Sequence, residues 1–367
     1  MDVQVLVYFY LAVCGSMIVF NCVYFALYRK GDRSVLLRNR RFLSKVRKVV
    51  QDLEEGGEVS QEHLQMLTRR CGNIMNFAAL DEELTGLRQE HGQAVEQYAR
   101  QLRPVFVSLV PVVRRKDDIQ QTHYAYMVEK YRVVQDDPIP VIVEFMLELV
   151  QSPNLYCRQN ALNVLYTTGD VDAVMNAVWL LSDGRHFNHE KLLTDGLLSF
   201  RGDREELINR LLKKRKAYSP AIQLVVLNFV RFGSGNHQEA FFEILQDPKE
   251  DDEFRFSAIR YFGRYPYEPA EPVIREFAAQ PEKQRWEYAS IAASALASYP
   301  GQETISVLKK CLTNPNWYIR YNAAVSLERF DLTYSELSDV LSGNDRFARE
   351  VLQYRLKARQ QEKEVSL

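Results

Sequence analysis

Cysteine is scarce in this chain and is never paired along the sequence. Among 367 residues the cysteines are Cys14, Cys22, Cys71, Cys157 and Cys311. No two of them have C-x-x-C spacing, and no group of cysteine and histidine has the spacing of a zinc site. Scattered cysteines are typical of a reducing compartment. The sequence therefore predicts no metal site and favours a cytoplasmic location for the folded part.

The chain also lacks the short motifs that mark common active sites. It has no P-loop, no glycine-rich dinucleotide turn and no H-E-x-x-H pair, and neither a G-x-S-x-G nor a kinase signature. His186 and His189 lie three residues apart, but no third ligand follows at a matching spacing. We therefore expect neither a catalytic site nor a cofactor, and we interpret the two histidines as surface residues at the start of a helix.

Charge is absent from the first part of the chain. No charged residue occurs between Val3 and Tyr28. A helix needs about 20 apolar residues to cross a bilayer, so residues 1–28 are predicted to form a single transmembrane helix. A cleaved signal peptide explains the run less well, because Asp2 is acidic and the run is too long. Asn21 lies inside the inner end of the span, where its amide is either tolerated near the interface or bonded to another membrane helix.

A basic segment follows the apolar run. Residues 29–50 contain nine basic residues and one acid, Asp32. Lysine and arginine beside a membrane helix stay in the cytoplasm and attract anionic lipid. We therefore expect a single-pass protein of the cell membrane, with its N-terminus outside and its body in the cytoplasm. The predicted contacts with lipid headgroups are Arg29, Lys30, Arg33, Arg38, Arg40 and Arg41.

The body after this segment is acidic. The whole chain carries a net charge of −1, so the basic segment is balanced by an excess of acid elsewhere. A nucleic-acid-binding protein would show a basic face on the folded domain itself. Nucleic acid is therefore not an expected partner.

A small residue followed four positions later by a large apolar one recurs along the second half. The small residue of the pattern is Ala161, Ala258, Ala292 or Ala323, and Asp195 and Leu227 stand at the intermediate positions that the same spacing predicts. Residues four apart share one face of a helix, and the successive steps are 34, 32, 31, 34 and 31 residues. Such a period is typical of a helical solenoid. The predicted fold is all-α: an α-solenoid of helix pairs preceded by a single transmembrane helix.

Each period is predicted to hold two helices with glycine or proline between them. The expected second helices are Val171–Leu181, Glu205–Leu212, Gln238–Leu245, Glu271–Ala279 and Glu303–Leu312.

Before the repeats we expect a helix from Ser60 toward Leu80 and another over Asp81–Leu102, with Pro104 and Pro111 interrupting the next segment. The predicted domains are a transmembrane helix (1–28), a basic juxtamembrane segment (29–50), a helical capping region (51–118), the solenoid (119–340), and a C-terminal helix with a solvated tail (341–367).

The segment from Leu312 to Leu327 carries a specific pattern. A turn containing Pro315 leads to the aliphatic–arginine pair Ile319-Arg320, and alanines and a leucine come after the pair. This segment resembles the HEAT repeat, in its bacterial phycobilisome-lyase-like variety, and weaker matches extend the resemblance over residues 150–335. The resemblance implies a fold and says little about function.

Three arginines stand at one offset in the pattern. Arg158, Arg255 and Arg320 each precede the alanine of their repeat by three residues. Equivalent positions in a repeat lie at equivalent places between neighbouring helices. We therefore predict that these arginines are structural and bond neighbouring carboxylates or carbonyls.

Two segments are candidates for partner binding. One is the basic run of Arg210, Lys213, Lys214, Arg215 and Lys216, which either contacts an acidic partner or reflects the preference of a helix C-terminus for positive charge. The other is Tyr265 and Tyr267, which flank a proline at an inter-helix turn and are expected to be exposed. Trp317 and Phe262 are expected to pack between repeats instead.

Stacked helix pairs offer a long surface but no enclosed pocket with converging polar groups. We therefore expect a non-enzymatic scaffold that binds a protein partner, which the anchor would place at the membrane. The resemblance implies an accessory subunit of a membrane or envelope-polysaccharide assembly. Two alternatives stay open. One is a bilin lyase-like enzyme, which would need acidic or cysteine residues in a pocket, and the other is a self-oligomerising membrane protein that uses Asn21.

Overall fold

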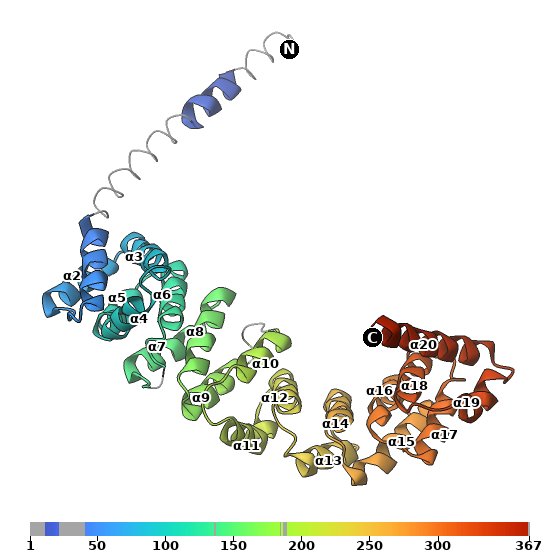
Figure 1. Cartoon of the computed structure of the whole chain (residues 1–367). Helices are drawn as coiled ribbons and strands as arrows, with labels where there is room; N and C mark the ends of the chain where they lie inside the picture. Colours follow the sequence, from blue (N-terminus) through green and yellow to red (C-terminus); the bar gives the residue numbers. More distant parts are fainter. Residues whose placement is uncertain (1–11, 22–40, 136, 184, 186–188, 366–367) are drawn as a thin grey trace, which may run out of the picture. The chain divides into compact units, whose positions relative to one another are not determined.

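The computed structural model describes residues 12–21, 41–135, 137–183, 185 and 189–365 (Figure 1). Every regular element in these ranges is a helix, which confirms the predicted all-α class. The chain divides into two compact units. Unit 1 ends at Thr168, and unit 2 begins at Gly169.

The predicted membrane segment is described only in part. Residues 12–21 are helical, and Asn21 is exposed at the end of this stretch. The rest of the predicted span and the predicted headgroup contacts from Arg29 to Arg40 lie outside the described residues. Arg41 is exposed at the start of a helix over residues 41–54. Within the part of the chain that the structure describes, no helix is both long enough and apolar enough to cross a bilayer.

Unit 1 is a stack of short helices around buried aromatic side chains. After the helix over residues 41–54 come α2 (Gln61–Cys71), α3 (Ile74–Leu87), α4 (Gly92–Gln101), α5 (Arg103–Val113), α6 (Asp118–Lys130), α7 (Pro140–Leu149) and α8 (Leu155–Thr167). Tyr98 and Tyr124 are buried. The Tyr98 hydroxyl lies 2.8 Å from Nε2 of His63, and Tyr124 donates to the Phe106 carbonyl at 2.9 Å. These bonds offset the cost of burying a polar group.

The helix expected from Ser60 toward Leu80 is shorter than predicted. It begins after Ser60 but ends at Cys71. Asn73 then caps a new helix, because its side chain accepts a hydrogen bond from the Met75 amide at 2.9 Å. Asparagine favours an N-cap over a helix interior, and this preference divides the segment into α2 and α3.

The helix expected over Asp81–Leu102 is also divided. Residues 88–91 separate α3 from α4. The two prolines after it were expected to interrupt the chain, but α5 contains both. Pro104 lies in its first turn, where a missing N–H costs little, and Pro111 lies near its end.

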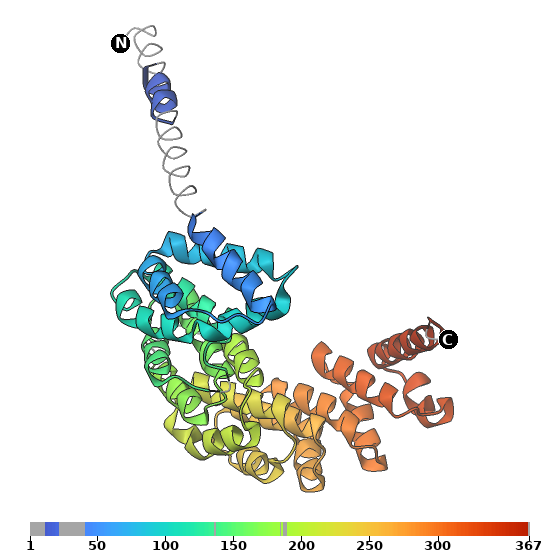
Figure 2. The ribbon, with the colours of Figure 1, turned by 60° about the vertical axis from the view of Figure 1, so that its left-hand side comes forward.

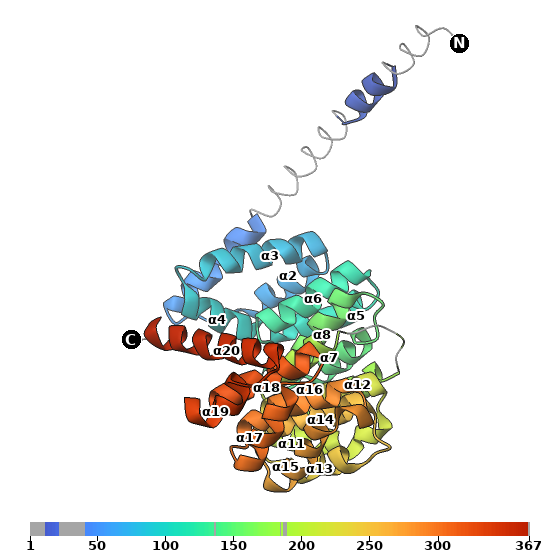
Figure 3. The ribbon, with the colours of Figure 1, turned by 90° about the vertical axis from the view of Figure 1, so that its right-hand side faces the viewer.

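Unit 2 consists of helix pairs in two layers (Figures 1 and 3). The first layer contains α10 (Glu190–Leu198), α12 (Pro220–Gly233), α14 (Asp252–Arg264), α16 (Trp286–Ala295) and α18 (Trp317–Arg329). The second contains α9 (Val171–Leu181), α11 (Arg204–Lys214), α13 (Gln238–Gln246), α15 (Glu271–Ala279), α17 (Gln302–Cys311) and α19 (Tyr334–Leu341). The predicted second helices are confirmed, and α9 and α15 have the predicted bounds. Helix α20 (Arg346–Val365), drawn in dark red in Figure 2, packs against α18 and α19.

The repeating alanines explain how the first layer packs. Ala258, Ala292 and Ala323 are fully buried, and consecutive first-layer helices from α10 to α18 contact each other directly. A small side chain lets two helix backbones approach closely, while the large apolar residue four positions later fills the space beside it. The sequence period is therefore the period of the helix stack.

Two arginines of the pattern fix the turn before their own helix. Nη1 of Arg320 donates to the carbonyls six and five residues earlier, at 2.8 and 3.2 Å. Nη1 of Arg158 makes the same two contacts at 2.8 and 3.0 Å. Arg349, in α20, also donates to the carbonyl six residues earlier. The predicted carbonyl contacts are confirmed, and the Arg349 contact extends the pattern to a helix that the sequence period did not include.

Arg255 varies this arrangement. Its Nε donates to the Leu245 carbonyl at 3.1 Å, and its Nη1 donates to the Tyr288 hydroxyl at 3.2 Å. Leu245 belongs to the preceding helix α13 and Tyr288 to the following helix α16. Arg255 therefore joins its own helix to a helix on either side.

Candidate protein-binding surface

A groove of about 500 Å³ lies on the first layer of unit 2. The basic residues that line it are Arg231 of α12, Arg260 and Arg264 of α14, and Arg329 of α18. Helix α16 lies between α14 and α18 and lines the groove without a charged side chain, and its Ser294 and Ala295 are small. A hollow therefore remains among the four arginines, and we call it the arginine groove.

Arg231 is half-buried in this groove. Its Nη2 donates to Oδ1 of Asn228 at 2.8 Å, and Asn228 in turn donates to Glu190. Its Nε is buried and has no hydrogen-bond partner among the described residues. Burial, and then the positive charges of Arg260 and Arg264, lower the pKa of Arg231 to about 10. Arg231 therefore stays charged at neutral pH while part of its hydrogen-bonding capacity is unused.

No described carboxylate lies close enough to the groove to neutralise its arginines. Within the described ranges, none of the four arginines has a carboxylate within 4.0 Å. Burial also lowers the pKa of Arg260, and Glu253 and Glu190 oppose that shift only from a distance. An anion in the groove would relieve the repulsion among the arginines and accept charge-assisted hydrogen bonds.

Exposed aromatic rings lie on the same layer. Trp286 of α16 stacks on Tyr318 of α18, with ring centres 5.4 Å apart, and Trp317 stacks on Tyr321 at 4.9 Å. Trp286, Trp317 and Tyr318 are 42%, 52% and 57% exposed. We call these four residues the aromatic platform. Large aromatic side chains with this much exposure are typical of protein interfaces.

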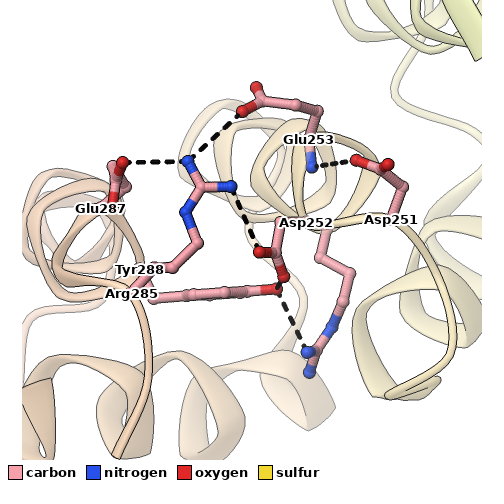
Figure 4. Close-up of polar contacts among 7 residues, drawn as sticks. Asp251, Asp252, Glu253, Arg285, Glu287 and Tyr288 are labelled. Carbon is pink, nitrogen blue, oxygen red and sulfur yellow. Dashed lines mark hydrogen bonds and ion pairs between the residues drawn. The ribbon is translucent and has the colours of Figure 1, made fainter. Parts of the chain in front are cut away.

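A network of ion pairs supports one end of the platform (Figure 4). Arg285, beside Trp286, pairs with Glu287 at 2.9 Å and Asp252 at 3.2 Å. The Tyr288 hydroxyl donates to the same Asp252 carboxylate at 2.7 Å. The hydrogen bond to Glu287, followed by that to Asp252, raises the pKa of Arg285. Because Asp252 begins α14 and Arg285 precedes α16, the network holds the start of α16 in place.

The groove and the platform share one face. Tyr318, Asn322 and Arg329 follow at intervals of four and seven residues along α18, so they lie on one stripe of that helix. Between them, Nδ2 of Asn322 donates to the carbonyl and hydroxyl of Ser290 on α16, at 2.9 and 3.0 Å. The first layer therefore presents positive charge and exposed aromatic surface side by side.

The basic run predicted to bind a partner has two kinds of members. Arg210 pairs with Asp172 and Glu206, and Arg215 is buried and pairs with Glu250. The remaining members are exposed, namely Lys213, Lys214 and Lys216. Arg210 therefore links α11 to α9, and Arg215 links the end of α11 to the turn before α14. A partner-binding role for the run stays a prediction that rests on the lysines.

The predicted tyrosines at the inter-helix turn are half-buried rather than exposed. Tyr265 packs against Tyr261, with ring centres 5.1 Å apart, and Tyr267 stacks on Phe262 at 5.9 Å. Phe262 is fully buried, as expected. The expectation for Trp317 is wrong, because this residue begins α18 and half of its surface faces solvent. A partner-binding role for Tyr265 and Tyr267 stays a prediction.

The described thiols in the body are buried. Cys71, Cys157 and Cys311 lie in the core, and burial raises the pKa of Cys71 and of Cys311 to about 12. A thiol with so high a pKa is a poor nucleophile. His189 accepts a hydrogen bond from the Lys191 amide at 3.2 Å as the cap of α10, while His186 lies outside the described residues.

Comparison with known proteins identifies the repeats. Residues 238–328 match the family of HEAT repeats. Within this segment the chain is similar to known HEAT repeats. The matched HEAT segment runs from α13 into α18 and includes the aromatic platform with Arg260 and Arg264.

Other comparisons add little to this family match. No curated protein matches the chain. A solved structure of human deoxyhypusine hydroxylase in complex with glycerol is 14% identical, and the match covers 81% of this chain and 95% of that chain with a TM-score of 0.28. A similarity this low supports no conclusion about arrangement or activity.

Sequence reasoning missed the arginine groove, although a signal was present. Arg231, Arg260 and Arg329 are separated by roughly one or two HEAT periods. In a stack of repeats, residues one period apart lie beside each other. A search for charge at the repeat period, rather than for runs of charge along the chain, would have found them.

Proposed function

We propose that this protein is a non-enzymatic HEAT scaffold, anchored in the cell membrane by residues 1–28, that binds a protein partner through the first layer of unit 2. The observation that supports this function is the presence of the arginine groove and the aromatic platform on one face. Tryptophan, tyrosine and arginine carry most of the binding energy at protein interfaces. A face built from these residues favours a partner over solvent.

The chemistry of this face defines the partner. The groove holds four arginines without a paired carboxylate in the described residues, so it suits a segment rich in aspartate or glutamate. The platform next to it suits apolar or aromatic side chains of the same segment. We therefore expect a partner segment in which acidic and apolar residues alternate over a few turns or an extended stretch.

The anchor places this surface in a compartment. The basic residues after the apolar run favour a cytoplasmic body, and a tether raises the effective concentration of any partner in the same membrane. The setting suggested by the sequence resemblance is a membrane or envelope-polysaccharide assembly. The buried thiols of the body disfavour the lyase alternative, since bilin attachment chemistry needs accessible groups.

Site-specific crosslinking tests the proposed surface. A photo-reactive phenylalanine at Tyr318 should yield one discrete adduct in native membranes. The matched control is the same substitution at Tyr334 of α19, which is also an exposed tyrosine, and it should yield none. The paired reversal R260E and R264E should abolish the Tyr318 adduct, whereas K310E on α17 should leave it. Equal adducts from both tyrosines, or an adduct that survives the groove reversal, would contradict the proposal. An adduct with the mass of two copies of the chain would favour self-oligomerisation.

The role of the anchor needs a separate experiment. Replacing residues 1–28 with an unrelated membrane helix of the same orientation should preserve the Tyr318 adduct, because the tether is unchanged. Deleting them should leave a folded helical body and reduce the adduct. If the body alone crosslinks as well as the full chain, membrane placement has no role. If the swapped anchor abolishes the adduct, Asn21 becomes the first residue to test.

A further inference from the structure

Unit 1 holds a second basic site. A pocket of about 540 Å³ lies between the ends of α3 and α6, the helix α4 and the start of α5. Its basic lining residues are Arg88, Arg100, Arg103, Lys130 and Arg132. Among the lining residues that the structure describes, only Glu96 and Asp137 are acidic, so these described residues carry a net charge of +3. We call it the basic pocket, and its volume falls within the range of about 300–1,000 Å³ that small ligands occupy.

The protein's own acids engage two of the five cations. Arg103 donates to Oδ2 of Asp137 at 2.7 Å, and Nζ of Lys130 donates to Oδ1 of Asp81 at 2.6 Å. The other three arginines, Arg88, Arg100 and Arg132, have no carboxylate within 4.0 Å among the residues that the structure describes. The guanidinium group of Arg88 lies 6.0 Å from the centre of the Tyr131 ring. Three guanidinium groups therefore border the pocket without an anionic partner in the described part of the chain.

The backbone of Arg132 is unusual. Its φ of 52° lies in the left-handed region. The amides of Arg132 and Val133 donate to the carbonyls of Glu129 and Val128, both at 3.0 Å, and so close the end of α6. This closing turn usually takes glycine, which adopts the left-handed region without strain. An arginine at this position therefore strains the backbone. Unlike glycine, however, it places a charged side chain in the pocket.

We propose that the basic pocket binds a phosphomonoester. Such a group carries about −1.5 to −2 charges at neutral pH, which matches the excess positive charge better than a single carboxylate does. Guanidinium groups bind pairs of phosphate oxygens with charge-assisted hydrogen bonds. A lipid headgroup and a soluble ester share this chemistry. The site is independent of the protein partner proposed for unit 2.

Titration calorimetry on the full chain in non-ionic detergent tests the pocket with two probes. Glycerol 3-phosphate represents the soluble source, and dibutyryl phosphatidic acid represents the lipid source with the same phosphate. Both should bind saturably, and R100Q should weaken both by about tenfold or more, as expected for the loss of a charged hydrogen bond. Tighter binding of the lipid probe would identify a headgroup as the source, and equal binding would identify a soluble ester.

Two further variants separate binding from folding. R132G should weaken binding while the melting temperature stays the same or rises, because glycine relieves the backbone strain. R115Q removes an exposed arginine outside the pocket in the same unit and should bind like the wild type. The proposal is overturned if neither phosphate binds, if R115Q loses as much affinity as R100Q, or if citrate binds as tightly as the phosphates.

Discussion

Replacing Arg320 with alanine should destabilise unit 2 without removing any core side chain. Nη1 of Arg320 holds two carbonyls of the turn before α18, at 2.8 and 3.2 Å, and its guanidinium group lies 5.2 Å from the centre of the Phe347 ring on α20. A hydrogen bond to a charged group contributes about 1.5–3 kcal/mol. Because the side chain is partly exposed and one nitrogen serves both carbonyls, we expect a loss of about 2 kcal/mol in the free energy of unfolding.

The assay is thermal unfolding followed by circular dichroism. For a unit of this size, about 2 kcal/mol corresponds to a fall of about 4–8 °C in melting temperature. Arg320→Lys should recover part of the loss, because an ammonium group keeps the charge but cannot reproduce the planar guanidinium. Lys310→Ala, on an exposed face of α17, is the control and should change stability by less than about 0.5 kcal/mol. A loss for Arg320→Ala no larger than that of the control would refute the structural role.

Three further substitutions or treatments test other features. Burial lowers the pKa of His63 below its usual 6.5. The folded state therefore binds fewer protons than the unfolded state just below that pH, and stability is lost as the pH falls through 6.5. The substitution His63→Gln should reduce the difference between the melting temperatures at about pH 7.5 and about pH 5.5. A Cβ on Gly202 would overlap a backbone carbonyl oxygen, whereas one on Gly301 would have no neighbour within 4 Å. Chemical denaturation should therefore show that Gly202→Ala lowers the free energy of unfolding by about 1–3 kcal/mol and that Gly301→Ala leaves it almost unchanged. Cys71 and Cys311 have raised pKa values near 12, so peptide mass spectrometry should find them unlabelled by iodoacetamide in native protein and labelled in denaturant.

The sequence was sufficient to predict the repeats, because their signals are local. The capping aspartate Asp170 and the proline after Glu271 mark where α9 and α15 begin, and both helices have the predicted bounds. The turn contacts of Arg158 and Arg320 were predictable for a related reason, since each reaches carbonyls only five and six residues away. Interactions within one turn of chain are encoded by short patterns.

The candidate sites depend on distances that short patterns do not encode. The arginine groove joins α12, α14 and α18, and its hollow exists because α16 contributes the small side chains of Ser294 and Ala295 between them. The exposure of Trp317 depends on where α18 begins relative to its neighbours, which its aromatic character did not reveal. The strained backbone of Arg132 has no sequence signal, because the closing turn it adopts usually contains glycine.

The contacts of Arg255 determine how unit 2 comes apart. In repeat proteins each repeat contacts only the neighbouring repeats, so unfolding can spread inward from either end of the stack. The two hydrogen bonds of Arg320 to carbonyls before α18 stay within a single turn, whereas those of Arg255 with Leu245 and Tyr288 join α13, α14 and α16. Amide hydrogens in these three helices should therefore exchange last, after those of the flanking repeats. The helices that carry Arg260, Arg264 and Trp286 would then keep their shape while the ends of the stack fray, and on a partly opened scaffold the partner would still meet the α14 and α16 part of its surface already formed.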